Sequence, residues 1–307
     1  MTRAVVFAYH NVGVRCLSVL LAHGIEVALV VTHRDNPAEN VWFDSVAELT
    51  ALHGISTITP SDPNEPAVVA QISKLSPDFL FSFYYRQMIK RPLLESARRG
   101  AYNMHGSLLP KYRGRAPVNW AVLHGERETG ATLHRMLEKP DAGAILARQA
   151  VPILPDDSAF EVFNKVTVAA EIALDGVLPQ LVAGTATETP QDLAQGAYFG
   201  GRRPEDGRID WRAPAQTIHN LVRAVAPPYP GAFCAFQDGT LRVHKSMLEP
   251  RRAPRPGAPG LYAEDGCVHA DCGDGGVLRL IALELDGRPL DAAGFIIRFG
   301  PEKLLLS

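Results

Sequence analysis

The chain has 307 residues, 46% of them hydrophobic and 21% charged, which is ordinary for a globular protein and long enough for two domains. Its formal net charge of −2 at pH 7 gives no overall electrostatic support for nucleic-acid binding. The apolar run at residues 4–8 is too short for a signal peptide or a membrane span. We therefore expect a cytoplasmic protein that binds neither nucleic acid nor a membrane.

Residues 1–150 alternate short apolar runs with segments of helical periodicity, which is typical of a parallel sheet with helices between its strands. The runs are continuous rather than alternating, as expected for strands buried on both faces. Strands are expected at residues 4–8, 27–31, 56–58, 79–83 and 101–104, and helices at 13–22, 43–52 and 66–75. The turn at residues 9–13 lacks the G-x-G-x-x-G spacing, which argues against a nicotinamide or flavin dinucleotide.

The next segment predicts a strand at residues 144–153 and then one long amphipathic helix. Ser158 and Glu161 have the spacing of a capping box at the start of this helix. Apolar residues close to helical spacing continue from Phe160 to Leu181, so we expect the helix to pack against the sheet.

From about residue 205 the pattern changes to short apolar runs between turns, at residues 241–244, 266–270 and 276–282. Such a pattern is typical of a small all-β domain. We therefore predict an α/β fold, with a doubly wound, mostly parallel sheet over residues 1–203. A small OB-like β-barrel is predicted over residues 204–307.

The four cysteines show no spacing of a disulfide framework. Cys267 and Cys272 flank His269, but two thiols and one imidazole without a second pair make a poor zinc site. We predict buried thiols in the β region and no metal.

An amide, an imidazole and a carboxylate stand out beside the predicted sheet. Asn103 and His105 lie at the end of the buried run 101–104, and Asp141 follows 36 residues after His105. In open α/β sheets, ligands bind outside the carboxyl ends of the strands. Formyl transfer onto an amine needs these three groups, for an oxyanion, a proton and the tuning of the imidazole. Taken singly, each residue could instead cap a strand, satisfy a polar contact or start a turn.

Together with Ser107 to Pro110 and Asp141 to Gly143, this pattern resembles the 10-formyltetrahydrofolate-dependent formyltransferases. The resemblance covers nearly the whole chain and extends to residues 111–120, 128–136 and 223–233. Within the family it is closest to the branch that formylates UDP-4-amino-4-deoxy-L-arabinose, in lipid A modification and polymyxin resistance. The segments that resemble this branch are residues 6–10, 81–86, 133–136 and 199–204.

The resemblance and the chemistry assign one role to each of the three residues. The Asn103 amide would donate a hydrogen bond to the tetrahedral oxyanion, and His105 would protonate the departing folate nitrogen. Asp141 would hold the His105 imidazole and raise its pKa.

By the same resemblance, a second group of residues would line the site of the co-substrate 10-formyltetrahydrofolate. They are Gln87, Met88, Ile89, Arg115, Leu137, Glu138, Lys139 and Pro140. Arg115 lies in a loop where it could meet the anionic tail of the folate. Met88 and Ile89 could equally form the first turn of a core helix. The variant of residues 138–140 in this chain leaves the shape of the folate loop open.

Basic residues are in excess toward the C-terminal part. Residues 201–256 contain ten Lys and Arg and five Asp and Glu, an excess of five. Arg202 and Arg203 follow Gly200 and Gly201 and could contact the diphosphate of a nucleotide sugar. A solvated pair of surface arginines is the alternative.

The sequence thus predicts an N-formyltransferase that acts on the amino group of a UDP-linked 4-amino sugar. Methionyl-tRNA formyltransferase, a non-catalytic folate-binding protein and a formyl-folate hydrolase are the alternatives. Many members of the L-arabinose branch carry a fused decarboxylating dehydrogenase, which this sequence lacks. We expect a separate protein to supply that oxidative step, or the sugar to be a different one.

Overall fold

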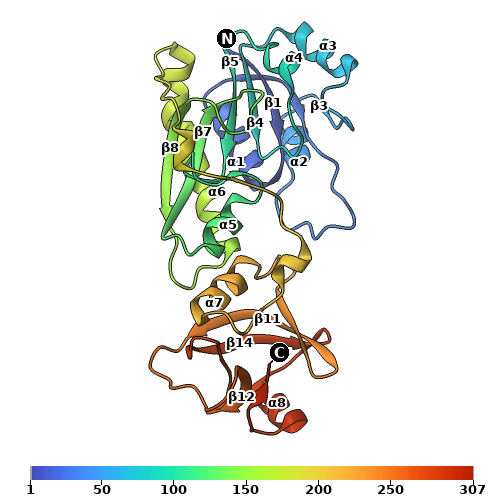
Figure 1. Cartoon of the computed structure of the whole chain (residues 1–307). Helices are drawn as coiled ribbons and strands as arrows, with labels where there is room; N and C mark the ends of the chain where they lie inside the picture. Colours follow the sequence, from blue (N-terminus) through green and yellow to red (C-terminus); the bar gives the residue numbers. More distant parts are fainter. Residues whose placement is uncertain (1, 307) are drawn as a thin grey trace. The chain divides into compact units, whose positions relative to one another are not determined.

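The computed structural model describes residues 2–306 (Figure 1). The chain forms two compact units. The first contains Met1–Pro117, Glu128–Pro152 and Phe163–Gly200, and the second contains Val118–Arg127, Ile153–Val162 and Gly201–Ser307. The functional division predicted at residue 203 stays a prediction.

A seven-stranded sheet forms the centre of the first unit, in the order β3-β2-β1-β4-β5-β7-β8 (Figure 1). Its strands are β1 (Arg3–Ala8), β2 (Glu26–Val31), β3 (Thr57–Ile58), β4 (Phe79–Phe83), β5 (Gly100–His105), β7 (Glu128–Arg135) and β8 (Ile145–Pro152). The pairs among β1 to β5 are parallel, whereas β7 pairs antiparallel with both β5 and β8. The sheet is therefore mostly parallel, as predicted, with one reversed strand.

Helices cover both faces of this sheet. The helices of the first unit are α1 (His10–Ala22), α2 (Val46–Leu52), α3 (Pro66–Leu75), α4 (Arg91–Leu94) and most of α6 (Ala159–Ala183), whereas nearly all of α5 (Pro117–Leu123) belongs to the second unit. On one face, Val5 and Phe7 of β1 share a buried cluster with Ile72 of α3 and Leu93 of α4. Next to the other face, α1 is joined to α6 by an ion pair of 2.6 Å between Arg15 and Glu171. The fold is thus doubly wound, as the sequence predicts.

The start of α6 has the predicted capping box. The Ser158 amide donates to Glu161 Oε2 at 2.6 Å, and the Glu161 amide donates to Ser158 Oγ at 3.3 Å. By length and composition α6 could cross a membrane, but half of its most apolar window is buried inside the protein. A core helix of a globular protein has the same properties.

Two helix boundaries differ from the prediction. The first helix begins at His10 rather than at residue 13, and the second begins at Val46 rather than at residue 43. The imidazole of His10 stacks on Phe43 with ring centroids 4.0 Å apart, which holds Phe43 in the loop. Ser45 then caps α2 by accepting a hydrogen bond of 3.3 Å from the Glu48 amide.

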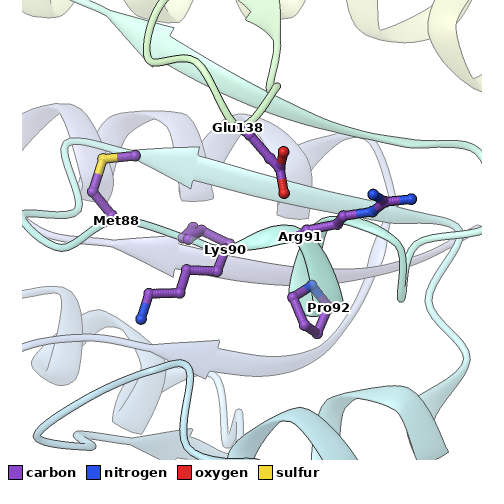
Figure 2. Close-up of a pocket in the computed structure, with 6 residues that line it drawn as sticks. Met88, Lys90, Arg91, Pro92 and Glu138 are labelled. Atoms are coloured by element: carbon purple, nitrogen blue, oxygen red, sulfur yellow. The ribbon is translucent and has the colours of Figure 1, made fainter.

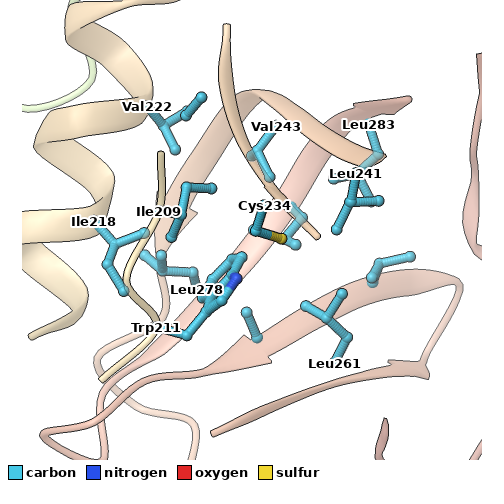
Figure 3. Close-up of a cluster of buried hydrophobic side chains, with 14 of the residues drawn as sticks. Ile209, Trp211, Ile218, Val222, Cys234, Leu241, Val243, Leu261, Leu278 and Leu283 are labelled. Atoms are coloured by element: carbon cyan, nitrogen blue, oxygen red, sulfur yellow. The ribbon is translucent and has the colours of Figure 1, made fainter. Parts of the chain in front are cut away.

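The second unit contains an antiparallel half-barrel in the order β10-β11-β14-β13-β12-β16, with β15 beside β14. Its elements are α7 (Ala215–Ala224), β10 (Ala232–Phe236), β11 (Gly239–Leu248), β12 (Gly260–Glu264), β13 (Cys267–Asp271), β14 (Val277–Leu285), β15 (Arg288–Pro289), α8 (Ala292–Phe299) and β16 (Leu304–Leu305). Figure 3 shows Trp211 in its core, among Ile218 of α7, Cys234 of β10 and Leu278 of β14. This confirms the predicted small β domain after the α/β domain.

Candidate active site

Asn103 and His105 lie on β5, at the carboxyl end of the sheet. They are two residues apart in an extended strand, so both side chains point to the same face. The neighbouring strand β7 places His134 opposite Asn103 in the register, and the chain after β7 leads to Asp141. The sheet therefore brings Asn103, His105 and Asp141 together, as the sequence predicts, and adds His134.

His105 is buried, with 6% of its surface exposed. Its Nε2 lies 2.8 Å from the carbonyl oxygen of Tyr112. Because a carbonyl oxygen can only accept, Nε2 carries the hydrogen and donates. In the neutral imidazole, Nδ1 is then the proton acceptor, and it lies 3.5 Å from Asp141 Oδ1. A proton on Nδ1 would face the carboxylate directly.

Asp141 is fixed by several contacts. Its Oδ2 accepts a hydrogen bond of 2.8 Å from the Gly114 amide, and its Oδ1 lies 3.5 Å from both His105 Nδ1 and His134 Nε2. Burial alone would raise the pKa of Asp141, but the electrostatic effect of His105 and the hydrogen bond from the Gly114 amide hold it well below its ordinary value. The side chain is therefore an anion at neutral pH.

The pKa of His105 is lowered overall, although Asp141 raises it as predicted. Burial lowers it, and this effect exceeds the increase caused by Asp141 and by the Tyr112 carbonyl. His134 lowers it further. The sequence predicts the effect of the carboxylate correctly, but it does not reveal how deeply the imidazole is buried. His105 is thus held mainly neutral, ready to accept a proton on Nδ1.

The Asn103 amide is oriented by His134. The Nδ1 of His134 lies 2.9 Å from the Arg135 carbonyl oxygen, so it donates there. In the neutral ring Nε2 then accepts from Asn103 Nδ2, at 3.2 Å. The amide nitrogen has two hydrogens, so it can keep this bond and donate a second one to a ligand. No role was predicted for His134, although it lies in residues 133–136, one of the segments that carry the resemblance.

The loop after β5 is fixed onto β7. The Thr132 hydroxyl donates to the Ser107 carbonyl at 2.6 Å and accepts from the Leu109 amide at 3.1 Å. Ser107 Oγ donates to the Lys111 carbonyl at 2.6 Å. The loop that carries Tyr112, the partner of His105, is therefore held at several points.

A cavity of about 340 Å³ lies in the first unit, lined by Met88, Ile89, Lys90, Arg91, Pro92 and Glu138. Figure 2 shows Glu138 extending from the loop after β7 toward the segment with Met88 and Lys90. Three of the eight predicted folate contacts, Met88, Ile89 and Glu138, thus line one cavity. Lys90, Arg91 and Pro92 were not predicted. The segment 88–90 is not helical, since α4 begins at Arg91.

The other predicted folate contacts lie differently. Gln87 donates to the Ser61 carbonyl at 2.8 Å and accepts from the Tyr85 hydroxyl at 3.2 Å. The side chain of Arg115 is exposed, while its amide donates to the Phe199 carbonyl at 3.0 Å. The remaining three are next to Glu138 in the chain but do not line the cavity: Leu137, Lys139 and Pro140.

Arg202 and Arg203 lie in the second unit. The guanidinium of Arg202 lies over the Trp120 ring, 4.9 Å from its centroid, and donates to the Asp206 carbonyl at 3.0 Å. The amide of Arg203 donates to Asp206 Oδ2 at 2.7 Å, and its side chain is exposed. Arg203 is therefore the more exposed of the two, while the guanidinium of Arg202 is partly covered and has two contacts within the second unit.

Within residues 2–306, no group of three or more His, Cys, Asp or Glu side chains is arranged to hold a metal ion.

Comparisons with solved structures give the same fold at low sequence identity. An N-formyltransferase from Helicobacter canadensis, in complex with folinic acid and dTDP-3-aminofucose, is 19% identical, with a TM-score of 0.72 over 91% of this chain and 99% of that one. A sugar N-formyltransferase from a Shewanella species is also 19% identical, with a TM-score of 0.63 over 81% and 99%. HypX from Aquifex aeolicus in complex with tetrahydrofolic acid is 20% identical, with a TM-score of 0.63 over 96% of this chain and 46% of that one.

Two family models match the sequence itself. The model of the formyl transferase family matches residues 7–178, and that of the formyl transferase C-terminal domain matches residues 202–300. The first alone covers more than half of the chain. The chain belongs to the formyl transferase family, and it is an enzyme that transfers a formyl group.

Proposed function

We propose that this enzyme transfers the formyl group of 10-formyltetrahydrofolate to the amino group of a nucleotide-linked amino sugar. The observation that carries the proposal is the arrangement of Asn103, the buried His105 and Asp141, with His105 Nδ1 3.5 Å from the carboxylate. One amide donor, one neutral imidazole and one anion are what acyl transfer to an amine requires.

In the proposed mechanism, the neutral amine attacks the formyl carbon and forms a new carbon–nitrogen bond. The second N–H of Asn103 donates to the oxygen that becomes negative, and losing one such donor typically costs about 2.7–4 kcal/mol. His105 Nδ1 accepts the proton of the attacking nitrogen, and the charge of Asp141 stabilises the imidazolium. The imidazolium then gives the proton to the folate nitrogen, whose bond to the formyl carbon breaks.

The proposed folate site contains the cavity between residues 88–92 and Glu138 (Figure 2). Its apolar residues Met88 and Ile89 suit the flat face of a pterin ring. The Helicobacter canadensis relative contains folinic acid and the HypX relative contains tetrahydrofolic acid, which supports a folate donor for this chain. Gln87, Arg115 and residues 137–140 would complete the site.

For the acceptor we propose UDP-4-amino-4-deoxy-L-arabinose, from the motif resemblance in four segments of the chain. The dTDP-3-aminofucose in the Helicobacter canadensis relative supports the broader class, a nucleotide-linked amino sugar. A separate decarboxylating dehydrogenase would then supply the oxidative step before formylation. A cytoplasmic location also stays a prediction.

The substitution Met88→Glu is expected to raise the KM for 10-formyltetrahydrofolate about tenfold or more, with little change in stability. Met88 is 53% exposed at the cavity, so the new carboxylate would meet the apolar part of the ligand without disturbing the core. Initial rates at varied folate concentration measure the effect. Leu52→Glu is the matched control, because Leu52 is an exposed apolar side chain elsewhere on the same unit. Equal KM values for Met88→Glu and the wild type would remove this cavity from the folate site.

Arg203→Ala is expected to raise the KM for the nucleotide sugar about tenfold and to leave the KM for formyl-folate nearly unchanged. The exposed guanidinium of Arg203 has the fork geometry that matches diphosphate oxygens. Arg202→Ala should have a smaller effect, because Arg202 lies over Trp120. Arg251→Ala is the control for an exposed arginine of the same unit. If the KM for the sugar stays at its wild-type value in both Arg202→Ala and Arg203→Ala, the diphosphate binds elsewhere.

A panel of acceptors tests the proposed function. The protein is incubated with 10-formyltetrahydrofolate and, in separate reactions, with UDP- and dTDP-linked amino sugars and with methionyl-tRNA. Products are identified by mass. We expect an N-formylated amino sugar nucleotide as the fastest product. Faster formylation of methionyl-tRNA under equal conditions would overturn the proposal.

A further inference from the structure

One segment of the chain contacts both loops that define the position of Asp141. This segment, residues 189–199, follows α6 and is called the strap below. At its start, the backbones of Thr189 and Ile145 exchange two hydrogen bonds of 2.8 Å each. Two residues later, the side-chain amide of Gln191 donates to the carbonyl oxygens of Asp141, at 3.1 Å, and Gly143.

The end of the strap holds the loop that donates to the Asp141 carboxylate. Its strand β9 (Tyr198–Phe199) pairs in parallel with β6 (Arg113–Gly114). The guanidinium of Arg113 donates to two strap carbonyls, of Leu193 at 3.2 Å and of Gly196 at 2.9 Å. The amide of Gly114 then reaches Asp141 Oδ2 at 2.8 Å. One end of the strap therefore holds the backbone of Asp141. The other end holds Gly114, whose amide donates to the Asp141 carboxylate.

The backbone of Asp141 needs such support. Its φ is +51°, in the left-handed region that a residue with a side chain rarely adopts. Next to it, Gly143 lies so close to the Arg135 carbonyl that no Cβ would fit. A strained turn keeps its shape only when surrounding bonds hold it, and the two bonds from Gln191 join the turn on both sides of Ala142.

The chemistry of Gln191 suits this task. A primary amide nitrogen has two hydrogens, so one atom can bridge two carbonyl oxygens. In the described part of the chain, the amide oxygen of Gln191 is buried without a hydrogen-bond partner. A buried oxygen without a hydrogen-bond donor lowers the stability of the fold, and the two hydrogen bonds that Gln191 donates offset this cost. The side chain thus serves the Asp141 turn as a donor.

We propose that Gln191 is a positioning residue for formyl transfer, which holds the Asp141 turn so that the carboxylate faces His105. The inference rests on the proposed roles of His105 and Asp141. Gln191 does not touch the reacting atoms in this account. It acts through the distance between Asp141 Oδ1 and His105 Nδ1, now 3.5 Å. A shift of about 1 Å at such a site can lower the rate about 100-fold.

Two variants and one control test the proposal. Gln191→Met keeps the length of the side chain and removes both donors, and Gln191→Glu keeps its shape but can only accept. Gln195→Met is the matched control, because Gln195 lies in the strap, is exposed and donates to Asp192 rather than to the Asp141 turn. Both Gln191 variants are expected to lower kcat at least about tenfold, with both KM values within about twofold of the wild type. Gln195→Met should behave as the wild type.

A second readout does not depend on any acceptor. The titration of His105 is followed by NMR in protein with labelled histidine, without substrates. The ionisable groups that face His105 are Asp141 and His134. If the Asp141 turn loosens, its carboxylate raises the pKa of His105 less, so the midpoint should move to lower pH in Gln191→Met. Gln191→Glu adds a carboxylate beside the turn, so this variant is compared by kcat alone. A purely structural role would lower the Tm and leave this midpoint in place.

The outcomes separate this inference from the proposed function. If kcat and the His105 midpoint stay at wild-type values in the folded Gln191 variants, the inference is wrong. If Gln191→Met does not fold, Gln191→Glu carries the kcat comparison. If the wild-type protein formylates no amino sugar, the proposed function fails, and the NMR titration still decides whether Gln191 positions Asp141.

Discussion

Replacing His105 with alanine is expected to lower kcat for formyl transfer by about 10²- to 10⁴-fold, the usual contribution of a positioned proton donor and acceptor. His105 Nε2 is bound to the Tyr112 carbonyl, which leaves Nδ1 for the proton, beside Asp141. Without the imidazole, the folate nitrogen would leave unprotonated, and it is a poor leaving group. Initial rates at saturating substrates measure kcat, and the circular dichroism spectrum checks that the variant is folded.

His53→Ala is the control for this variant, because His53 is exposed at the end of α2 in the same unit. It should keep the wild-type kcat. A folded His105→Ala enzyme with near-native kcat on its true acceptor would contradict the assignment of His105 as the proton carrier.

Asp141→Asn is expected to lower kcat about 10- to 1,000-fold, because an adjacent opposite charge typically shifts a pKa by about 1–3 units. The asparagine oxygen can still accept from the Gly114 amide, so the turn should keep its shape. What is lost is the charge that stabilises the His105 imidazolium. The measurement is kcat as a function of pH, with Asp192→Asn in an exposed part of the strap as the control. An unchanged kcat would show that the charge of Asp141 plays no part.

Asp141→Asn should also differ from the wild type in how its free energy of unfolding changes at acid pH. The folded-state pKa of Asp141 is lowered, so its contribution to stability is present above the unfolded pKa of about 3.9 and is lost as the pH falls below it. From about pH 5 to about pH 3, the wild type should therefore lose more of its free energy of unfolding than Asp141→Asn. Urea unfolding at several pH values measures this difference. Equal losses would mean that the carboxylate is not held below its ordinary pKa.

The sequence predicts most of the fold because the strands of a parallel sheet are buried on both faces. The runs at residues 66–75 and 79–83 match α3 and β4 to the residue. The strand β7 was not predicted, because its sequence contains Gly130 and several polar residues. Thr132 and His134 are nevertheless buried, since their side chains bond to a neighbouring loop, to Asn103 and to the backbone rather than to water.

Only the part of the candidate site that depends on local sequence patterns was predicted. Asn103, His105 and Asp141 belong to a recognisable local pattern, and the sheet does bring them together. The contact between Asn103 and His134 depends on the register of two antiparallel strands, which local sequence does not determine. The contact of Gln191 with Asp141 joins residues 50 positions apart, through a segment that carries no periodic signal. The low pKa of His105 likewise results from burial in the folded structure.

The transfer of a labelled formyl group shows directly whether this enzyme formylates an amine. The enzyme is given 10-formyltetrahydrofolate with carbon-13 in the formyl group and a UDP-linked 4-amino sugar, and the label is followed by NMR. We expect the label to appear as an N-formyl group on the sugar, and His105→Ala to suppress this signal. If the label appears instead as free formate at the same rate with or without the sugar, water is the acceptor, and the account of amine formylation is wrong.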